Sequence, residues 1–140
     1  MDAKLSGMET VLKALADTTR LRILSLLVAG EVCVCHIHQS LRVPQPTASR
    51  HLAYLRRTGL VKTRRQRQWV YYRLAEPQDE VLQTLLSCVR HCLTHLSTTG
   101  RDRHRLGQRT GCCLAVEQQP TVTCCGTGRQ DATAKSPSGA

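Results

Sequence analysis

The chain has 140 residues, of which 41% are hydrophobic, and a formal net charge of +10. This length fits one domain, perhaps followed by a tail. No run of about 18 apolar residues and no secretory signal is visible, so we expect a cytoplasmic protein without a membrane span. In that compartment the eight cysteines are expected to be reduced thiols or metal ligands and not disulfides.

The basic charge is concentrated in the middle of the chain. No Asp or Glu occurs from Val32 to Ala75, whereas Lys and Arg occur nine times. The same segment has the spacing of apolar residues that a folded core requires. This combination is typical of a surface that faces a polyanion, most often nucleic acid.

Apolar spacing predicts four helices in the first half of the chain. The first covers roughly residues 7–16, and the second covers residues 20–29, with Asp17 or Thr18 as its cap. A short third helix begins near the cysteine pair and is broken by "RVPQP". The fourth covers residues 46–58, with Ala48, Leu52 and Leu55 facing inward. Two short helices joined by a tight turn form a helix-turn-helix pattern.

The second half contains a predicted β-hairpin, a helix and a tail. Residues 60–74 are rich in Val, Tyr and Trp at both ends and basic in the middle, which predicts a hairpin with a basic tip. After Pro77 the residues Leu82, Leu85, Leu86, Val89, Leu93 and Leu96 form a wide apolar stripe, which a partner subunit would cover. We therefore expect a mainly α-helical DNA-binding and dimerisation domain over residues 1–96. Residues 97–140 are expected to be a largely disordered, cysteine-containing tail.

These segments resemble the winged helix-turn-helix repressors of the ArsR/SmtB family, and in particular its arsenic- and antimony-responsive branch. The resemblance is carried by "ALADTTRLRILSLL", "EVCVCHIHQSL", "QPTASRHLAYLRRTGLV" and "WVYYRL". It implies a homodimer that binds double-stranded operator DNA and leaves it when As(III) or Sb(III) binds. The sequence departs from the family at two points. Pro44 replaces the usual Ser at the start of the reading helix, which is the predicted fourth helix, and "RRQRQ" lacks Gly at the wing tip, which is the tip of the predicted hairpin.

The resemblance also implies two groups of DNA-contacting residues. Gln45, Thr47, Ser49, Arg50 and His51 open the reading helix, where Gln suits adenine and Arg suits guanine in the major groove. Arg64, Arg65 and Arg67 at the wing tip would contact phosphates or the minor groove. For His51 the alternative is that it only packs against the preceding helix.

The sequence "CVC" indicates the inducer site. Trivalent arsenic and antimony are soft and prefer thiolate sulfur, which Cys33 and Cys35 offer. Successive helical residues are rotated by about 100°, so these two positions cannot share an ion within a regular helix. Either the segment is already irregular or binding makes it so. The family resemblance implies two candidates for a third ligand: His38, which stands where some relatives have a third cysteine, or a thiol of the tail, from Cys112, Cys113, Cys124 and Cys125. His36 and His38 could also do no more than cover the surface.

Three alternatives remain open. On the same fold, thiols and imidazoles could instead sense a divalent soft metal such as cadmium, lead or zinc. Cys88, His91, Cys92 and His95 share one face of the last predicted helix and could hold a metal there. An arsenic-processing thiol enzyme is disfavoured because no Gly-rich or CX5R anion loop and no CXXC motif is present. We therefore predict neither catalytic residues nor a catalytic cofactor.

Overall fold

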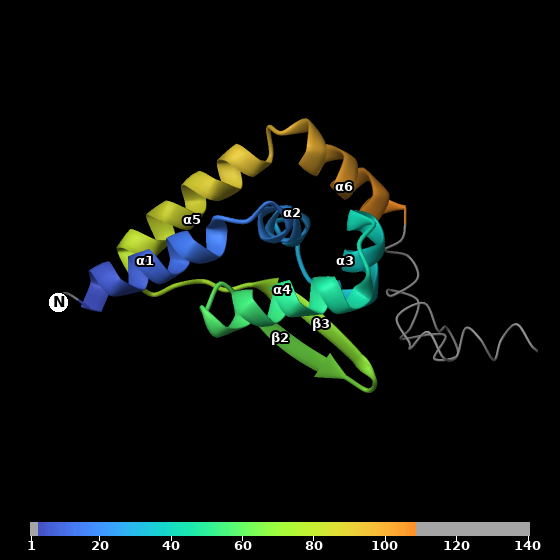
Figure 1. The fold of residues 1–140 in the computed structure, drawn as a ribbon, viewed down its shortest axis with the longest axis horizontal. Coiled ribbons are helices and arrows are strands. Elements are labelled where there is room, and N and C mark those ends of the chain that lie inside the picture. The colour runs from blue at the N-terminus through green and yellow to red at the C-terminus, as the bar shows by residue number, and fades with distance from the viewer. Residues whose placement is uncertain (1–2, 109–140) are drawn as a thin grey trace, which may run out of the picture.

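The computed structural model describes residues 3–108 and shows six helices and three short strands there (Figure 1). The elements are α1 (Ala3–Leu15), α2 (Thr18–Leu27), β1 (Val32–Cys33), α3 (Val34–Leu41), α4 (Gln45–Arg57), β2 (Val61–Gln66), β3 (Trp69–Leu74), α5 (Glu80–Leu93) and α6 (Ser97–Gly107). The predicted mainly helical, winged helix-turn-helix fold is confirmed. Within residues 3–108, no helix is both long and apolar enough to cross a membrane.

The helix α2 begins at the predicted cap. The side chain of Asp17 accepts a hydrogen bond of 3.0 Å from the backbone amide of Arg20, which satisfies one of the unpaired donors of the first turn. Helix α1 starts at Ala3, four residues earlier than expected, and Leu5 in its first turn is exposed. The apolar spacing therefore located both helices but not the start of α1.

The turn between α3 and α4 depends on one left-handed residue. Arg42 follows α3 with φ 59° and ψ 44°, and the chain continues through Val43 to Pro44 in extended conformation. Pro44 occupies the capping position of α4 and makes no side-chain cap hydrogen bond. The departure from the family's usual Ser therefore leaves this helix start without a side-chain cap. Pro46 in the first turn needs no amide partner.

The wing is a three-stranded antiparallel sheet in the order β1-β3-β2. The predicted hairpin of β2 and β3 is present, and β1 adds a third strand by pairing Val32 with Tyr72 and Cys33 with Tyr71. The wing tip turns without Gly because Arg67 itself takes a left-handed conformation, with φ 58°. Left-handed backbone is costly for a residue with a Cβ.

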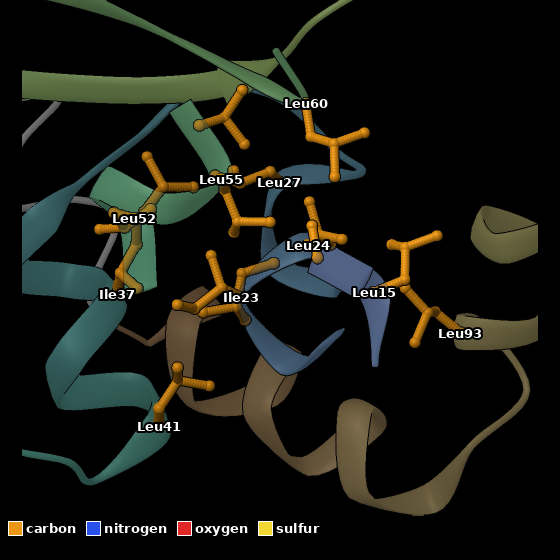
Figure 2. Close-up of a cluster of buried hydrophobic side chains, with 14 of the residues drawn as sticks. Leu15, Ile23, Leu24, Leu27, Ile37, Leu41, Leu52, Leu55, Leu60 and Leu93 are labelled. Atoms are coloured by element: carbon orange, nitrogen blue, oxygen red, sulfur yellow. The ribbon is translucent and has the colours of Figure 1, made fainter. Parts of the chain in front are cut away.

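The core lies between α2 and the two helices of the helix-turn-helix. Ile23, Leu24 and Leu27 of α2 meet Ile37 of α3 and Leu55 of α4 (Figure 2). The inward positions predicted for α4, which are Ala48, Leu52 and Leu55, are fully buried. Packing against this cluster fixes the angle at which α4 presents its outer face.

The prediction of a disordered tail from residue 97 is wrong for its first part, because residues Ser97–Gly107 form α6. This helix packs on α2 and α3 (Figure 1). Its only large apolar residue is Leu106, so the sequence shows no helical stripe. Leu96, the last residue of the predicted stripe, precedes α6 and is exposed. Residues 109–140, including Cys112, Cys113, Cys124 and Cys125, lie outside the described part of the chain.

Buried charge holds α6 in place. Asp102 has no exposed surface and accepts hydrogen bonds of 2.8 and 2.9 Å from Arg22 of α2 and of 2.6 Å from Arg105. This hydrogen bonding raises the pKa of Arg22 above its usual value. The two arginines also donate to the carbonyls of Leu41 and Ser40 at the end of α3. Helix α6 therefore braces the point where α3 turns toward α4.

Candidate thiol site and nucleic-acid interface

The two cysteines lie at the junction of β1 and α3. Cys33 ends the strand with φ −81° and ψ 158°, and Cys35 is in the first turn of the helix. Both are buried, and their sulfur atoms are 3.4 Å apart, which is contact without an S–S bond. Of the two expectations for this segment, the one that it is already irregular is correct. An extended Cys33 removes the helical rotation that would have separated the two thiols.

A third potential ligand at the junction is His36. The ligand atoms of Cys33, Cys35 and His36 lie within 4.8 Å of one another, and all three residues are buried. His38, the histidine that the family resemblance indicated, lies outside this group. Its ring nitrogen Nδ1 donates to the carbonyl of Val43 at 3.2 Å, in the turn that leads to α4. Each histidine follows one of the cysteines by three residues, so spacing alone does not distinguish them.

The redox state of Cys33 determines whether this group can bind an ion. Cys33 is disulfide-bonded in the structure, which differs from the expectation that the cysteines are reduced thiols or metal ligands. A thiolate is the species that coordinates a soft ion, so binding through Cys33 requires the reduced form. The geometry of the junction is therefore that of a potential three-donor site in a reducing environment.

The junction is connected to both parts of the predicted DNA interface. Cys33 of the junction pairs with Tyr71 in the wing sheet, and Cys35 lies in α3, the helix that precedes α4. Just before the strand, both carboxylate oxygens of Glu31 accept hydrogen bonds from Arg64 at 2.8 to 3.1 Å. The Arg64 guanidinium also lies 4.6 Å from the ring centre of Tyr71. A displacement at the junction would therefore reach the wing directly.

The predicted reading helix α4 exposes part of the set expected to contact bases. Gln45 and Arg50 are exposed, while Thr47 and Ser49 are partly buried. His51 differs, because its Nδ1 lies 3.4 Å from the guanidinium of Arg20 and 3.9 Å from Asp17. This geometry favours packing over a free base contact, but His51 packs on the start of α2 and not on the preceding helix, α3, as the alternative expected.

Asp17 is the acidic partner of this contact. Burial acts to raise the pKa of Asp17, but the Arg20 amide hydrogen bond and the charges of His51 and Arg20 outweigh it and lower the pKa below its usual value. Asp17 thus stays ionised between α2 and α4. It fixes the start of α2 and, through His51, one side of α4.

The three wing arginines have different surroundings. Arg65 and Arg67 are exposed at the tip, Arg65 near the end of β2 and Arg67 in the turn itself. Arg64 is also exposed but pairs with Glu31 and donates to Gln66 at 2.8 Å. The sequence contained no signal for this pairing, because Glu31 and Arg64 are far apart along the chain.

The cysteines and histidines predicted to share a face of the last helix do not form a comparable group, and His95 lies just beyond the end of α5. Cys88, His91, Cys92 and His95 are exposed, and the rings of His91 and His95 contact each other edge to face at 4.7 Å. In the described part of the chain, the close group of three ligands is the one at the β1–α3 junction.

Comparison with known proteins now identifies the fold family. Residues 17–63 match the family model described as "Bacterial regulatory protein, arsR family". The arsenic resistance transcriptional regulator ArsR1 of Pseudomonas putida is 54% identical over 81 residues, which are 56% of this chain and 62% of that protein. The chain thus spans less than two thirds of that relative. The arsenical resistance operon repressor of Staphylococcus aureus is 38% identical over 79 residues, covering 56% of this chain and 76% of the repressor.

A solved structure supports the same assignment. The homodimeric winged helix-turn-helix domain of Mb0332 from Mycobacterium bovis, a possible ArsR-family regulator, matches with a TM-score of 0.54 and 38% identity. The match covers 68% of this chain and 86% of that domain. These relatives are transcription regulators and not enzymes. Because 76% of a repressor is covered at 38% identity, the chain belongs to the ArsR family of bacterial regulatory proteins.

Proposed function

We propose that this protein is a metalloid-responsive transcriptional repressor. As a homodimer it binds double-stranded operator DNA, and it leaves the DNA when As(III) or Sb(III) binds to thiolates. The observation that carries the proposal is the 3.4 Å separation of the Cys33 and Cys35 sulfurs at the junction of the wing and the helix-turn-helix. The arsenic-resistance names of the relatives from Pseudomonas putida and Staphylococcus aureus support it.

The chemistry of the site suits a soft ion. Two neighbouring thiolates supply most of the coordination that a trivalent arsenic or antimony ion prefers. Because the sulfurs are already in contact, binding does not have to unwind α3 to bring them together. The tail cysteines Cys112, Cys113, Cys124 and Cys125 remain candidates for additional sulfur ligands.

Release from DNA requires that the inducer bind the two conformations with different affinity. Cys33 moves with the wing sheet, whereas Cys35 moves with α3 and the turn to α4. An ion that bridges both sulfurs would fix the position of β1 relative to α3. We infer that this fixed arrangement is incompatible with simultaneous contact of α4 and the wing with the operator.

The DNA-binding half of the proposal rests on charge and exposure. Gln45 and Arg50 are exposed on α4 and would read base edges, with Thr47 and Ser49 beside them. Arg65 and Arg67 extend from the wing and would contact phosphates, and Arg64 would join them once released from Glu31. His51 would act mainly by holding α4 against α2. A regulator that acts on bacterial operator DNA would work in the cytoplasm.

The dimer is proposed from unburied apolar surface and from the homodimeric relative. Among the apolar residues of α5, Leu82, Leu85, Leu86 and Val89 are only partly buried, and Val81 is exposed. Leu5 and Leu12 of α1 are exposed as well. Burying such side chains against a second subunit stabilises each by about 1.5–3 kcal/mol.

An electrophoretic mobility shift on the DNA upstream of the gene tests the function. The reduced full chain should bind this DNA and be released by arsenite and antimonite at lower concentration than by cadmium or zinc. The double variant Cys33→Ser, Cys35→Ser should still bind the DNA but resist release by arsenite. A matched double variant, Cys88→Ser with Cys92→Ser, should respond like the parent. Normal release of the Cys33/Cys35 variant would refute the proposed inducer site.

A further inference from the structure

A basic hollow, which we call the α6 hollow, lies between α6 and the turn that leads into the reading helix α4. Its lining includes Arg42 of that turn and Arg101, His104 and Arg105 of α6, and none of the described residues that line it is acidic. We propose that the α6 hollow is a further DNA-contacting surface, which binds phosphates of the DNA backbone beside the groove that receives α4. The inference rests on the proposed DNA binding and adds a surface outside the reading helix and the wing.

One side of α6 supplies most of the lining. Its residues in the hollow follow one another at helical spacing and therefore share a face of the helix; they are Ser97, Gly100, Arg101, His104, Arg105 and Gln108. Thr99, Asp102 and Leu106 point the other way and are buried, where α6 packs on α2 and α3. The buried side holds the helix in place, so the basic side is left to face a partner.

Arg42 and Arg101 have donors to spare. Both are exposed, and neither forms an ion pair with another residue of the described range 3–108. Arg101 donates one long hydrogen bond, of 3.4 Å, to the hydroxyl of Thr98, which leaves most of its five N–H donors available. A guanidinium group matches two phosphate oxygens at once. The two arginines therefore offer the donors that a phosphodiester requires.

The negative groups near the hollow are already compensated. The buried Asp102 carboxylate accepts hydrogen bonds from Arg22 and Arg105. The carbonyls of Ser40 and Leu41, which carry the negative end of the α3 dipole, accept from Arg105 and Arg22 at 2.6 and 3.1 Å. An approaching phosphate therefore meets guanidinium groups and not unpaired oxygen atoms.

The position of the hollow suits the backbone of DNA bound to α4. Arg42 precedes Gln45, the first residue of α4, by three residues, and three extended residues span at most about 11 Å. The major groove is about 12 Å wide, so phosphates border a helix seated in it at a comparable distance. Helix α6 lies beside the end of α3, next to this turn (Figure 1). DNA that receives α4 therefore brings phosphates near Arg42 and the basic side of α6.

The length of the basic face favours DNA over a small anion. The 11 residues of α6 extend over about 16 Å, and the charged side chains are spread along this length. Each DNA strand carries a phosphate for every 3.4 Å or so of the duplex axis, so a strand can meet several of these side chains at once. A single phosphate ion would occupy only part of the face.

The test measures how DNA affinity depends on salt. The reduced full chain is titrated onto the upstream DNA and onto a random duplex by fluorescence anisotropy at several salt concentrations. Each phosphate contact adds about 0.9 to the slope of log affinity against log salt. In a dimer, Arg101→Gln removes two contacts and should lower the slope by about 1.8 on both duplexes. Arg42→Gln together with Arg101→Gln should lower it by about 2–4 and weaken binding at about 0.1 M salt by at least about tenfold.

Arg103→Gln is the matched control, because it removes the same charge from the same helix. The Arg103 guanidinium donates to the carbonyls of Leu93 and Thr94 near the end of α5 and does not line the hollow. Charges farther from DNA than about 10 Å are largely screened at this salt concentration. The control should therefore change the affinity by less than about threefold and leave the slope unchanged.

Several results would overturn the inference. These are an unchanged slope in the double variant, a loss in Arg103→Gln as large as that in Arg101→Gln, or a loss confined to the upstream DNA, which would indicate base reading. Unchanged DNA binding with lost binding of inorganic phosphate in calorimetry would assign the hollow to a free anion instead. If circular dichroism shows that the double variant is unfolded, Arg101→Gln alone decides against Arg103→Gln.

The same measurements separate this inference from the proposed function. An unchanged slope leaves the proposed repressor intact if the parent still binds the upstream DNA and is released by arsenite. A parent that loses slope on Arg101→Gln but is not released by arsenite would retain the α6 hollow as a DNA contact and lose only the metalloid response.

Discussion

Substitution of Asp102 by Asn tests the role of α6 most directly. The Asp102 carboxylate is fully buried and accepts hydrogen bonds from Arg22 and Arg105 at 2.6 to 2.9 Å. Asn has nearly the same shape but carries no charge, and it has one acceptor oxygen where Asp102 uses two. With that oxygen in the place of Oδ1, its NH2 group would face Arg22 Nε, which needs an acceptor. The substitution therefore leaves two partly buried cations without their counter-charge.

The expected loss of stability follows from this arrangement. Removing one partner of a buried ion pair costs about 3–5 kcal/mol. The side chains of Arg22 and Arg105 are 21% and 20% exposed, so water partly replaces the lost carboxylate. We expect the free energy of unfolding to fall by about 2–4 kcal/mol. For a domain of about 100 residues, a loss of this size lowers Tm by roughly 10–20 °C.

Urea denaturation followed by circular dichroism measures this loss. Parent and variant must be compared at one protein concentration, because stability of a dimer depends on it. Glu76→Gln is the matched control, since Glu76 is an exposed carboxylate, and it should change the free energy of unfolding by less than about 0.5 kcal/mol. If Asp102→Asn behaved like this control, α6 would not be held by its buried charge and the brace on α3 would be refuted.

Three further substitutions test the cap, the wing and the reading helix. Asp17→Ala should lower the free energy of unfolding by about 1 kcal/mol at neutral pH. The pKa of Asp17 is lowered in the fold. The difference in stability between parent and variant should therefore be present above pH ~4 and disappear as the pH falls through the folded pKa. An equal difference in acid would contradict the role of the ionised Asp17 as the cap of α2. Arg67→Gly should raise the free energy of unfolding in urea by up to about 1 kcal/mol, because Gly takes the left-handed conformation without strain. The same substitution should weaken operator binding. A loss of stability would contradict the left-handed turn at the wing tip. Arg50→Ala should weaken operator binding by about 1–3 kcal/mol while hardly affecting random DNA. Arg65→Ala, which removes an expected phosphate contact of the wing, should instead weaken both in a titration by fluorescence anisotropy.

Much of the fold and part of the site could be predicted from local patterns. The spacing of Ala48, Leu52 and Leu55 identified the buried face of α4, and Asp17 identified the start of α2. The cysteine pair was recognisable because thiolates are few and their ligand chemistry is specific. The site could not be completed in the same way, since His36 and His38 have equivalent spacing. The position at which β1 ends and α3 begins determines which imidazole lies near the two sulfurs.

The sequence by itself therefore determined the winged helix-turn-helix, the basic surface and the two thiols, because each depends on residues close together along the chain. Only the tertiary structure decided that α6 exists, that Arg64 pairs with Glu31 and that His51 contacts α2. These features depend on charges brought together from distant segments, such as Asp102 and Arg22. A pairing of this kind leaves no periodicity in the sequence, and its energy becomes favourable only where the surrounding fold has removed water from the carboxylate.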